Sequence, residues 1–169
     1  GPAFRAIAPR PSYLPRELFG AAFVAMAETL GGTLDDDQVR EAVDRQYAAT
    51  IDAAVLRPDC LATLGRLRAD GLHVQIVSNI DEEQLTGLVE RLGLARVLVA
   101  ATSSEAADSC KPDPGIYEFA LQKAECVAAD VLFVGDSPVH DVVGPQSIGM
   151  ATALLVAGGG VLWVGRHKA

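Results

Sequence analysis

The sequence predicts an α/β fold, in which a parallel sheet is covered by helices on both faces and a small helical unit precedes it. Short apolar strands alternate with amphipathic helices after Pro58. These strands are apolar throughout, which is typical of a parallel sheet that is buried on both faces. Two helical patterns precede Pro58 with no strand between them. We therefore expect a helical cap and linker over residues 1–56 and an α/β core over residues 57–169.

Composition narrows the class of protein. The chain has 169 residues, of which 50% are hydrophobic, so it can bury a core. Its net charge of −8 argues against nucleic acid as a partner. No apolar run is long enough to cross a bilayer, and we find no signal-peptide pattern. The three cysteines are widely spaced and match no metal pattern, which fits a reducing compartment. We expect a cytoplasmic protein without a membrane partner.

The predicted cap consists of two helices. In the first, over residues 15–32, apolar side chains recur at helical spacing until a Gly pair ends the pattern. In the second, over residues 33–51, acidic residues fill the first turn, and Val39, Val43 and Tyr47 share one face. We interpret the acids at 35–37 as a solvated helix start rather than as a metal site.

The core pattern begins after the cap. The strands that we expect cover residues 72–79, 95–100, 131–135 and 151–157. The helices that we expect cover residues 58–71, 81–93, 113–124 and 137–149. Pro145 lies inside the last of these helices and is expected to end or kink it. Because ligands bind open parallel sheets at the carboxyl ends of the strands, the residues that follow each strand are the candidate site.

These strand ends carry a hydroxyl, an ammonium group and two carboxylates. The residues are Ser78 and Asn79 after one strand, Lys111 on the loop after the next, and Asp136 and Asp141 after the third. The Ser78 hydroxyl and the Asn79 backbone N–H can donate to phosphate oxygens, and Lys111 can neutralise developing negative charge. The two aspartates can hold Mg²⁺. Each residue alone has an ordinary structural explanation, so the prediction depends on the whole set.

Three segments resemble motifs of the haloacid dehalogenase superfamily. “VSN” resembles its second motif, “KPDPGIY” its third and “GDSPVHD” its fourth, and the likeness covers roughly residues 57–157. The resemblance implies a Rossmann-like core with a helical cap, in which Ser78 and Lys111 bind the transferring phosphoryl group. It also implies that Asp136 and Asp141 bind or support Mg²⁺. The acids of the fourth motif make the chain similar to the phosphatase branch, whose substrates are small phosphorylated metabolites.

The first motif of that superfamily is not found in the sequence. It is an apolar strand ending in Asp-x-Asp-Gly-Thr, whose first Asp is the nucleophile and whose second is usually the general acid/base. No Asp or Glu precedes Glu17, and the acids at 35–37 follow no strand. We expect a truncated chain that starts just past this motif, whether the strand was removed or never present. Such a chain would show no appreciable turnover and would bind Mg²⁺ weakly.

In the family that strand lies between the Ser78 strand and the Asp136 strand. We therefore expect a gap or an exposed edge in the sheet. The tail segment “VLWV” (161–164) can pair in the gap or form an ordinary extra edge strand, and we favour the edge strand. A strand from another chain is the third alternative, and it would give a swapped homo-oligomer through the unpaired edge.

Two other functions compete with the phosphohydrolase. One is a non-catalytic binding or interaction domain, which the absent nucleophile favours and the joint presence of Ser78, Lys111, Asp136 and Asp141 disfavours. The other is a phosphoacceptor domain of the receiver type. In a receiver the acids precede the hydroxyl, whereas here they follow the lysine, so we rank it last. No spacing in the predicted cap indicates a particular substrate.

Overall fold

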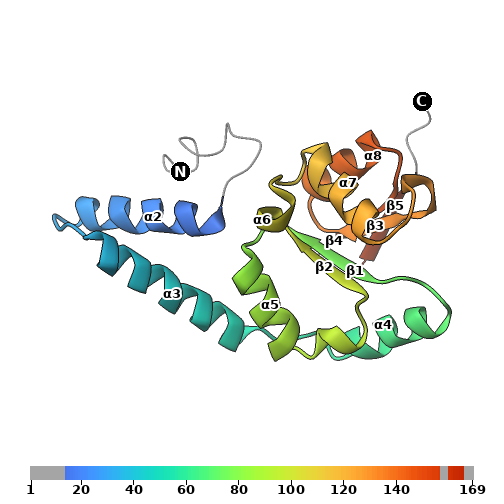
Figure 1. The fold of residues 1–169 in the computed structure, drawn as a ribbon, viewed down its shortest axis with the longest axis horizontal. Coiled ribbons are helices and arrows are strands. Elements are labelled where there is room, and N and C mark those ends of the chain that lie inside the picture. The colour runs from blue at the N-terminus through green and yellow to red at the C-terminus, as the bar shows by residue number, and fades with distance from the viewer. Residues whose placement is uncertain (1–13, 157–159, 166–169) are drawn as a thin grey trace.

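The computed structural model describes residues 14–156 and the backbone of residues 160–165 (Figure 1). The helices are α2 (Pro15–Thr29), α3 (Asp36–Ala53), α4 (Cys60–Ala69), α5 (Glu82–Arg91), α6 (Ser104–Ala107), α7 (Pro114–Lys123) and α8 (Gly144–Ser147). Two 3₁₀-helical turns are η1 (Leu94–Arg96) and η2 (Ala128–Asp130), and η3 (Pro138–Val143) is a π-helical segment. The strands are β1 (Gln75–Ser78), β2 (Ala100–Ser103), β3 (Leu132–Gly135), β4 (Ala151–Val156) and β5 (Gly160–Gly165). None of the described helices is long and apolar enough to cross a membrane.

The helices α2 and α3 form a hairpin that projects from the α/β core (Figure 1). The second helix begins with a capping box, because the Asp35 side chain accepts from the Gln38 N–H at 2.9 Å and the Gln38 side chain accepts from the Asp35 N–H at 3.0 Å. The acids of its first turn are exposed, which agrees with the solvated helix start expected from the sequence. Val43 and Tyr47 are buried on the shared face that the sequence predicts.

The strands form two separate sheets within the described residues. β1 pairs with β2 in parallel, and β3 pairs with β4 in parallel. The α/β class with parallel strands is thereby confirmed. β5 runs antiparallel to β4, on the edge away from β3, so the tail forms the ordinary edge strand that we favoured.

The break between the two sheets lies between β1 and β3. Within the described residues, each of these strands is paired along one edge only, and no ladder joins the two. This part of the chain thus shows the gap expected from the sequence. On β3, the side chains of Leu132 and Val134 are 49% and 50% exposed. An apolar parallel strand is normally covered on both faces, so this exposure marks the side of the core that is incompletely covered.

Two expected elements differ from the structure. Residues 95–100 do not form one strand, because Leu94–Arg96 makes a turn and the strand runs from Ala100 to Ser103. The apolar pattern misplaced this strand because its inner residues are hydroxyl-bearing: Thr102 and Ser103 are fully buried beside β1. The expected helix over 137–149 divides into the π-helical turn η3 and the short α8, with Pro145 in the first turn of α8.

One hydrophobic cluster holds the two sheets side by side. Ile116 and Tyr117 of α7 are fully buried together with Met150. Val77 of β1 and Phe133 of β3 both pack against this cluster, so α7 contacts the two sheets at once. The sheets are therefore joined by burial of apolar surface rather than by backbone hydrogen bonds.

Candidate functional site

The loops that follow β1 and β2 are joined by the side chain of Asn79. Its Nδ2 donates to the carbonyl oxygen of Lys111 at 2.9 Å, and its Oδ1 accepts from the Lys111 backbone N–H at 2.6 Å. The sequence led us to expect a role for the Asn79 backbone N–H. The structure adds that the Asn79 side chain fixes the backbone of Lys111, across 32 residues of sequence. The spacing of the motifs that contain Asn79 and Lys111 does not predict this contact.

The Lys111 side chain reaches from its loop to the loop after β3. Its Nζ donates to Oδ1 of Asp141 at 2.7 Å, and both side chains are largely buried. The ammonium group also lies 5.5 Å from the centroid of the Phe133 ring, a distance at which a cation is attracted to an aromatic face. Two partners therefore hold the cation in a fixed place at the strand ends.

Asp141 organises the loop that carries Asp136. Its Oδ2 accepts from the backbone N–H groups of Asp136 at 3.1 Å and Ser137 at 2.9 Å. A Cβ atom at Gly135 would overlap the Asp141 carboxyl group, so only glycine lets this side chain approach the end of β3. Both carboxylate oxygens of Asp141 are thus bonded within the protein.

The Asp136 carboxylate is exposed and has no bonded partner within the described residues. Mg²⁺ is commonly held by one or two carboxylates together with water and a substrate phosphate. Asp136 fits the role of such a ligand, whereas Asp141 already bonds Lys111 and two N–H groups. The described part of the chain contains no group of three or more His, Cys, Asp or Glu that could hold a metal ion. The residues present therefore fit an incomplete Mg²⁺ site with one free carboxylate.

Ser78 is the last residue of β1 and lies in register with Ser103 of β2. Its side chain is half-buried, and no bond of its hydroxyl is recorded within residues 14–156. This hydroxyl is free to donate to an anion. The strand ends therefore offer a hydroxyl, an ammonium group and one carboxylate without a partner in the described residues, whereas the sequence led us to expect two carboxylates for the metal; the second, Asp141, is bonded within the protein.

Tyr117 is a supporting residue to which the sequence analysis gave no role. It is fully buried, and its hydroxyl donates to the carbonyl oxygen of His140, next to Asp141. Burial raises the pKa of Tyr117, and the negative charges of Asp141 and Asp113 raise it further. The tyrosine closes “KPDPGIY”, but only the fold shows that its hydroxyl reaches η3.

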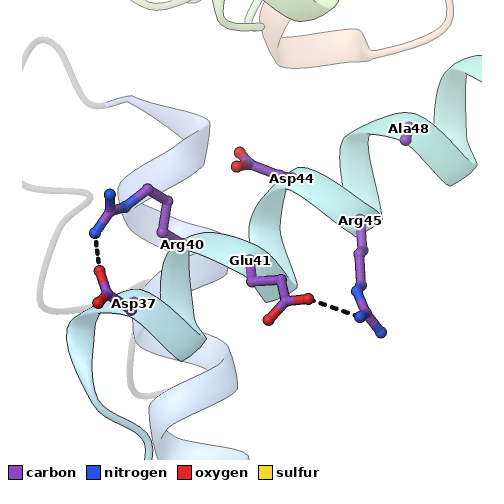
Figure 2. A pocket seen from close by; sticks show the side chains of 6 residues that line it. All are labelled: Asp37, Arg40, Glu41, Asp44, Arg45 and Ala48. Carbon is purple, nitrogen blue, oxygen red and sulfur yellow. Dashed lines mark hydrogen bonds and ion pairs between the residues drawn. The ribbon is translucent and has the colours of Figure 1, made fainter.

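A separate crevice of about 470 Å³ lies on α3 (Figure 2). All the residues that line it belong to this one helix: Asp37, Arg40, Glu41, Asp44, Arg45 and Ala48. Arg40 pairs with Asp37, and Arg45 pairs with Glu41 at 2.6 Å, as Figure 2 shows. Its charged groups are exposed and largely neutralise each other, so this crevice is a solvated helix face and not a candidate site.

Comparison with known proteins gives a consistent family. Residues 6–149 match the family of haloacid dehalogenase-like hydrolases. The chain is 37% identical over 94 residues to haloacid dehalogenase-like hydrolase domain-containing protein 3 of Homo sapiens, covering 56% of this chain and 37% of that protein. It is 32% identical over 113 residues to phosphoglycolate phosphatase of Yersinia pseudotuberculosis, covering 66% of this chain and 48% of that protein. The matched region thus spans less than half the length of these relatives.

Solved structures share the fold. A haloacid dehalogenase-like hydrolase of Bacillus subtilis, bound to magnesium, has a TM-score of 0.75 at 18% identity and covers 91% of this chain and 67% of that one. The L-2-haloacid dehalogenase of Xanthobacter autotrophicus has a TM-score of 0.71 at 23% identity and covers 90% of this chain and 59% of that one. The similar proteins therefore include both a phosphatase and a dehalogenase.

Proposed function

The chain belongs to the haloacid dehalogenase-like hydrolase family, and we propose that it supplies the phosphoryl-binding residues of a Mg²⁺-assisted phosphohydrolase that acts on small phosphate monoesters. One observation carries the proposal. The Lys111 ammonium group is fixed between Asp141 and the Phe133 ring, on the same rim as the Asp136 carboxylate and the Ser78 hydroxyl, neither of which has a bonded partner in the described structure. A fixed cation, a hydroxyl donor and a metal-binding carboxylate are what a phosphoryl group requires.

In the proposed reaction an Asp carboxylate attacks the phosphorus atom in line with the leaving group. The bond between phosphorus and the ester oxygen breaks, the leaving alcohol takes a proton from a general acid, the second Asp of the first motif, and an aspartyl phosphate is formed. Water then attacks this phosphoryl group and releases inorganic phosphate and the free carboxylate. We place the nucleophile outside the 169 residues, because no acid of the sequence precedes Glu17.

The residues of this chain bind and orient the phosphoryl group. The Ser78 hydroxyl and the Asn79 N–H donate to its oxygens. Lys111 uses one ammonium proton on Asp141, so two protons are left for the phosphoryl oxygens and the attacking carboxylate. When bound at Asp136, Mg²⁺ supplies charge neutralisation for the phosphoryl oxygens. Asp141 positions both Lys111 and the Asp136 loop.

Among the described residues, one edge of β1 and one edge of β3 have no partner strand, which supports a place for the nucleophile between them. A strand running parallel to both would end at the rim, between Ser78 and Asp136, and would also pair the free backbone groups. Without that strand we propose no appreciable turnover for the 169-residue chain. The alternative is a non-catalytic phosphate-binding or interaction domain, which the same absence favours.

A dehalogenase is a second enzymatic candidate, because the L-2-haloacid dehalogenase of Xanthobacter autotrophicus shares the fold. Displacement of halide from a 2-haloacid needs no metal-binding carboxylate. The exposed Asp136, which has no bonded partner among residues 14–156, therefore favours phosphoryl transfer. A 2-haloacid belongs in the assay as the competing substrate.

The experiment is hydrolysis of an aryl phosphate in the presence of Mg²⁺. The 169-residue chain is compared with a chain extended upstream of Ala3 through a strand ending in Asp-x-Asp-Gly-Thr. We expect activity only in the extended chain, and we expect the change of its first Asp to Asn to abolish that activity. Release of halide from the 2-haloacid with no phosphate release would favour the dehalogenase. Inactivity of the extended chain on both substrates would leave the non-catalytic domain.

A further inference from the structure

Asp81 lies three residues after Ser78, immediately before α5. An aspartate in this place normally caps its own helix, but the Asp81 side chain makes no such bond. Its Oδ2 instead accepts from the backbone N–H of Arg16 at 2.9 Å and from the hydroxyl of Tyr47. Asp81 is 4% exposed, so these are buried bonds to a carboxylate. The connection between β1 and α5 is therefore tied to both helices of the hairpin.

The first helix of the hairpin depends on this bond. Its N-cap residue is Leu14, whose side chain cannot accept a hydrogen bond, and Pro15 has no N–H group. The Arg16 N–H therefore has no acceptor within its own helix. Asp81, 65 residues away in the sequence, accepts this hydrogen bond. The carboxylate also places negative charge at the positive end of the helix dipole. A residue of the core therefore caps the helix hairpin.

The guanidinium group of Arg16, on α2, contacts side chains of both α3 and α5 near Asp81. It lies 5.0 Å from the centroid of the Tyr47 ring, and it pairs with Asp44 of α3 at 2.7 Å and with Glu83 of α5 at 2.9 Å. Both acidic partners are exposed, so these two pairs contribute little. The buried bond from Tyr47 to Asp81 is the stronger link, because its acceptor is a carboxylate shielded from water.

A second contact fixes the direction of the hairpin. Ile51, near the end of α3, packs so close to Gly87 of α5 that a Cβ atom there would lie 2.7 Å from the Ile51 Cδ1 atom. The hairpin therefore contacts the core at Gly87 as well as at Asp81, and of these two contacts the one at Asp81 is adjacent to the strand-end rim.

We propose that the hydrogen bond between Tyr47 and Asp81, here called the joint, fixes the position of the helix hairpin relative to the β1–α5 connection. We also propose that Tyr47 and Asp81 are positioning residues for the Ser78 and Asn79 donors. Ser78, Asn79 and Asp81 lie within four residues of one another, so a shift of the hairpin that moves Asp81 moves the donors as well. The effect on phosphoryl binding rests on the proposed function, whereas the joint itself does not.

The joint also contains a titratable group, so that its opening depends on pH. Oδ1 of Asp81 is buried and has no hydrogen-bond partner among the described residues, which is costly for an ionised group. Burial raises the pKa of Asp81, the bonds from Tyr47 and Arg16 oppose the rise, and the charge of Glu105 on α6 adds to it. An open joint would return Asp81 to water and to its ordinary pKa. The closed joint therefore holds the proton more tightly, and acid favours closure.

The test is amide hydrogen exchange on the 169-residue chain and its Tyr47→Phe variant. Phenylalanine keeps the ring that packs edge-on against Phe19 but removes the hydroxyl donor. We expect exchange at Arg16 and over residues 79–83 to rise about tenfold, with β4 and α7 unchanged. The matched control is Asp44→Asn, which removes an exposed partner of Arg16 and should change exchange less than about twofold. No local rise in Tyr47→Phe, or an equal rise in β4 and α7, would overturn the proposal.

A second variant tests the joint without removing Tyr47. Asp81→Asn keeps an acceptor oxygen but cannot titrate in this range. After correction for the intrinsic rate, we expect exchange at Arg16 in the unmodified chain to slow as the pH falls through the raised pKa of Asp81. The Asp81→Asn variant should lack this pH dependence. Retention of the same dependence in the variant would contradict the role of Asp81.

The link to the donors is measured by titration with inorganic phosphate. We expect Tyr47→Phe to weaken phosphate binding about threefold or more and Asp44→Asn to leave it unchanged. If the unmodified chain binds no phosphate, the proposed function fails while the exchange experiment still decides on the joint. If phosphate binds equally to the unmodified chain and to Tyr47→Phe, the positioning role is wrong and the proposed function stands.

Discussion

Lys111 and Asp141 form an ion pair with 2.7 Å between Nζ and Oδ1, and their side chains are only 13% and 6% exposed. The two residues are 30 positions apart and come from the loops after β2 and β3. Since Asn79 bonds the Lys111 backbone and Asp141 bonds the Asp136 loop, this pair connects all three strand ends.

Removing the cation should leave Asp141 buried without its partner. We predict that Lys111→Met lowers the free energy of unfolding by about 3 kcal/mol, because an uncompensated buried charge is costly. Urea denaturation measures this change. The control is Lys123→Met, whose exposed ammonium group bonds only the carbonyl oxygen of Ala101, and it should cost less than about 1 kcal/mol. An equal loss in the two variants would show that the buried pair is not the stronger one.

Gly135 should tolerate no side chain. Gly135→Ala would force its Cβ into the Asp141 carboxyl group, so we predict a loss of about 2 kcal/mol and broken bonds to the Asp136 and Ser137 N–H groups. The matched control is Gly65→Ala in α4, where a Cβ atom meets nothing within 4 Å. That change should stabilise the helix by about 0.5–1 kcal/mol. Thermal unfolding of the two variants should shift in opposite directions.

Substitution of Asp136 and of Asp141, the two acids that follow β3, should have different effects on stability and on Mg²⁺ binding. Asp136 has no bonded partner in the described structure, so we predict that Asp136→Asn changes the free energy of unfolding by less than about 0.5 kcal/mol. The same change should abolish the weak Mg²⁺ binding of the chain, as followed by calorimetry. Asp141→Asn should instead be strongly destabilising, because three bonds end on its carboxylate. A stable Asp141→Asn chain would contradict its organising role.

Tyr117 should make the fold sensitive to alkaline pH. Burial raises the pKa of its hydroxyl above the ordinary 10.0. The folded chain then keeps a proton that the unfolded chain loses, so stability is fully present below pH 10 and falls as the pH rises further. We predict that Tyr117→Phe reduces the loss of stability between pH 10 and 11 by about 1 kcal/mol. An unchanged slope in denaturation experiments would show that Tyr117 ionises normally.

Much of the fold could be predicted from the periodicity of apolar residues, but this prediction failed where buried residues are polar. The alternation after Pro58 indicated the parallel α/β core, and the lack of an Asp-x-Asp-Gly-Thr sequence led us to expect the gap that the described residues show between β1 and β3. The second strand was misplaced because Thr102 and Ser103 are fully buried although their side chains are polar. An apolar pattern cannot locate a strand whose inner residues carry hydroxyl groups.

The sequence predicted which residues lie at the site, but it did not predict the hydrogen bonds that join them. Lys111 and Asp141 follow successive strands along the chain, which placed them at one rim, and the structure brings them together. The side-chain bonds of Asn79 to the Lys111 backbone depend on directions that spacing does not encode. The same holds for Asp81, whose sequence position suggests a cap for α5 but whose carboxylate caps α2.

The most direct measurement is an amide NMR titration of the 169-residue chain with inorganic phosphate. We predict saturable shifts at the N–H groups of Asn79, Asp136 and Ser137, and weaker binding in Ser78→Ala, which removes the unbonded hydroxyl. Shifts of the same size in Ser78→Ala, or shifts confined to the charged face of α3, would contradict a phosphoryl site at the strand ends.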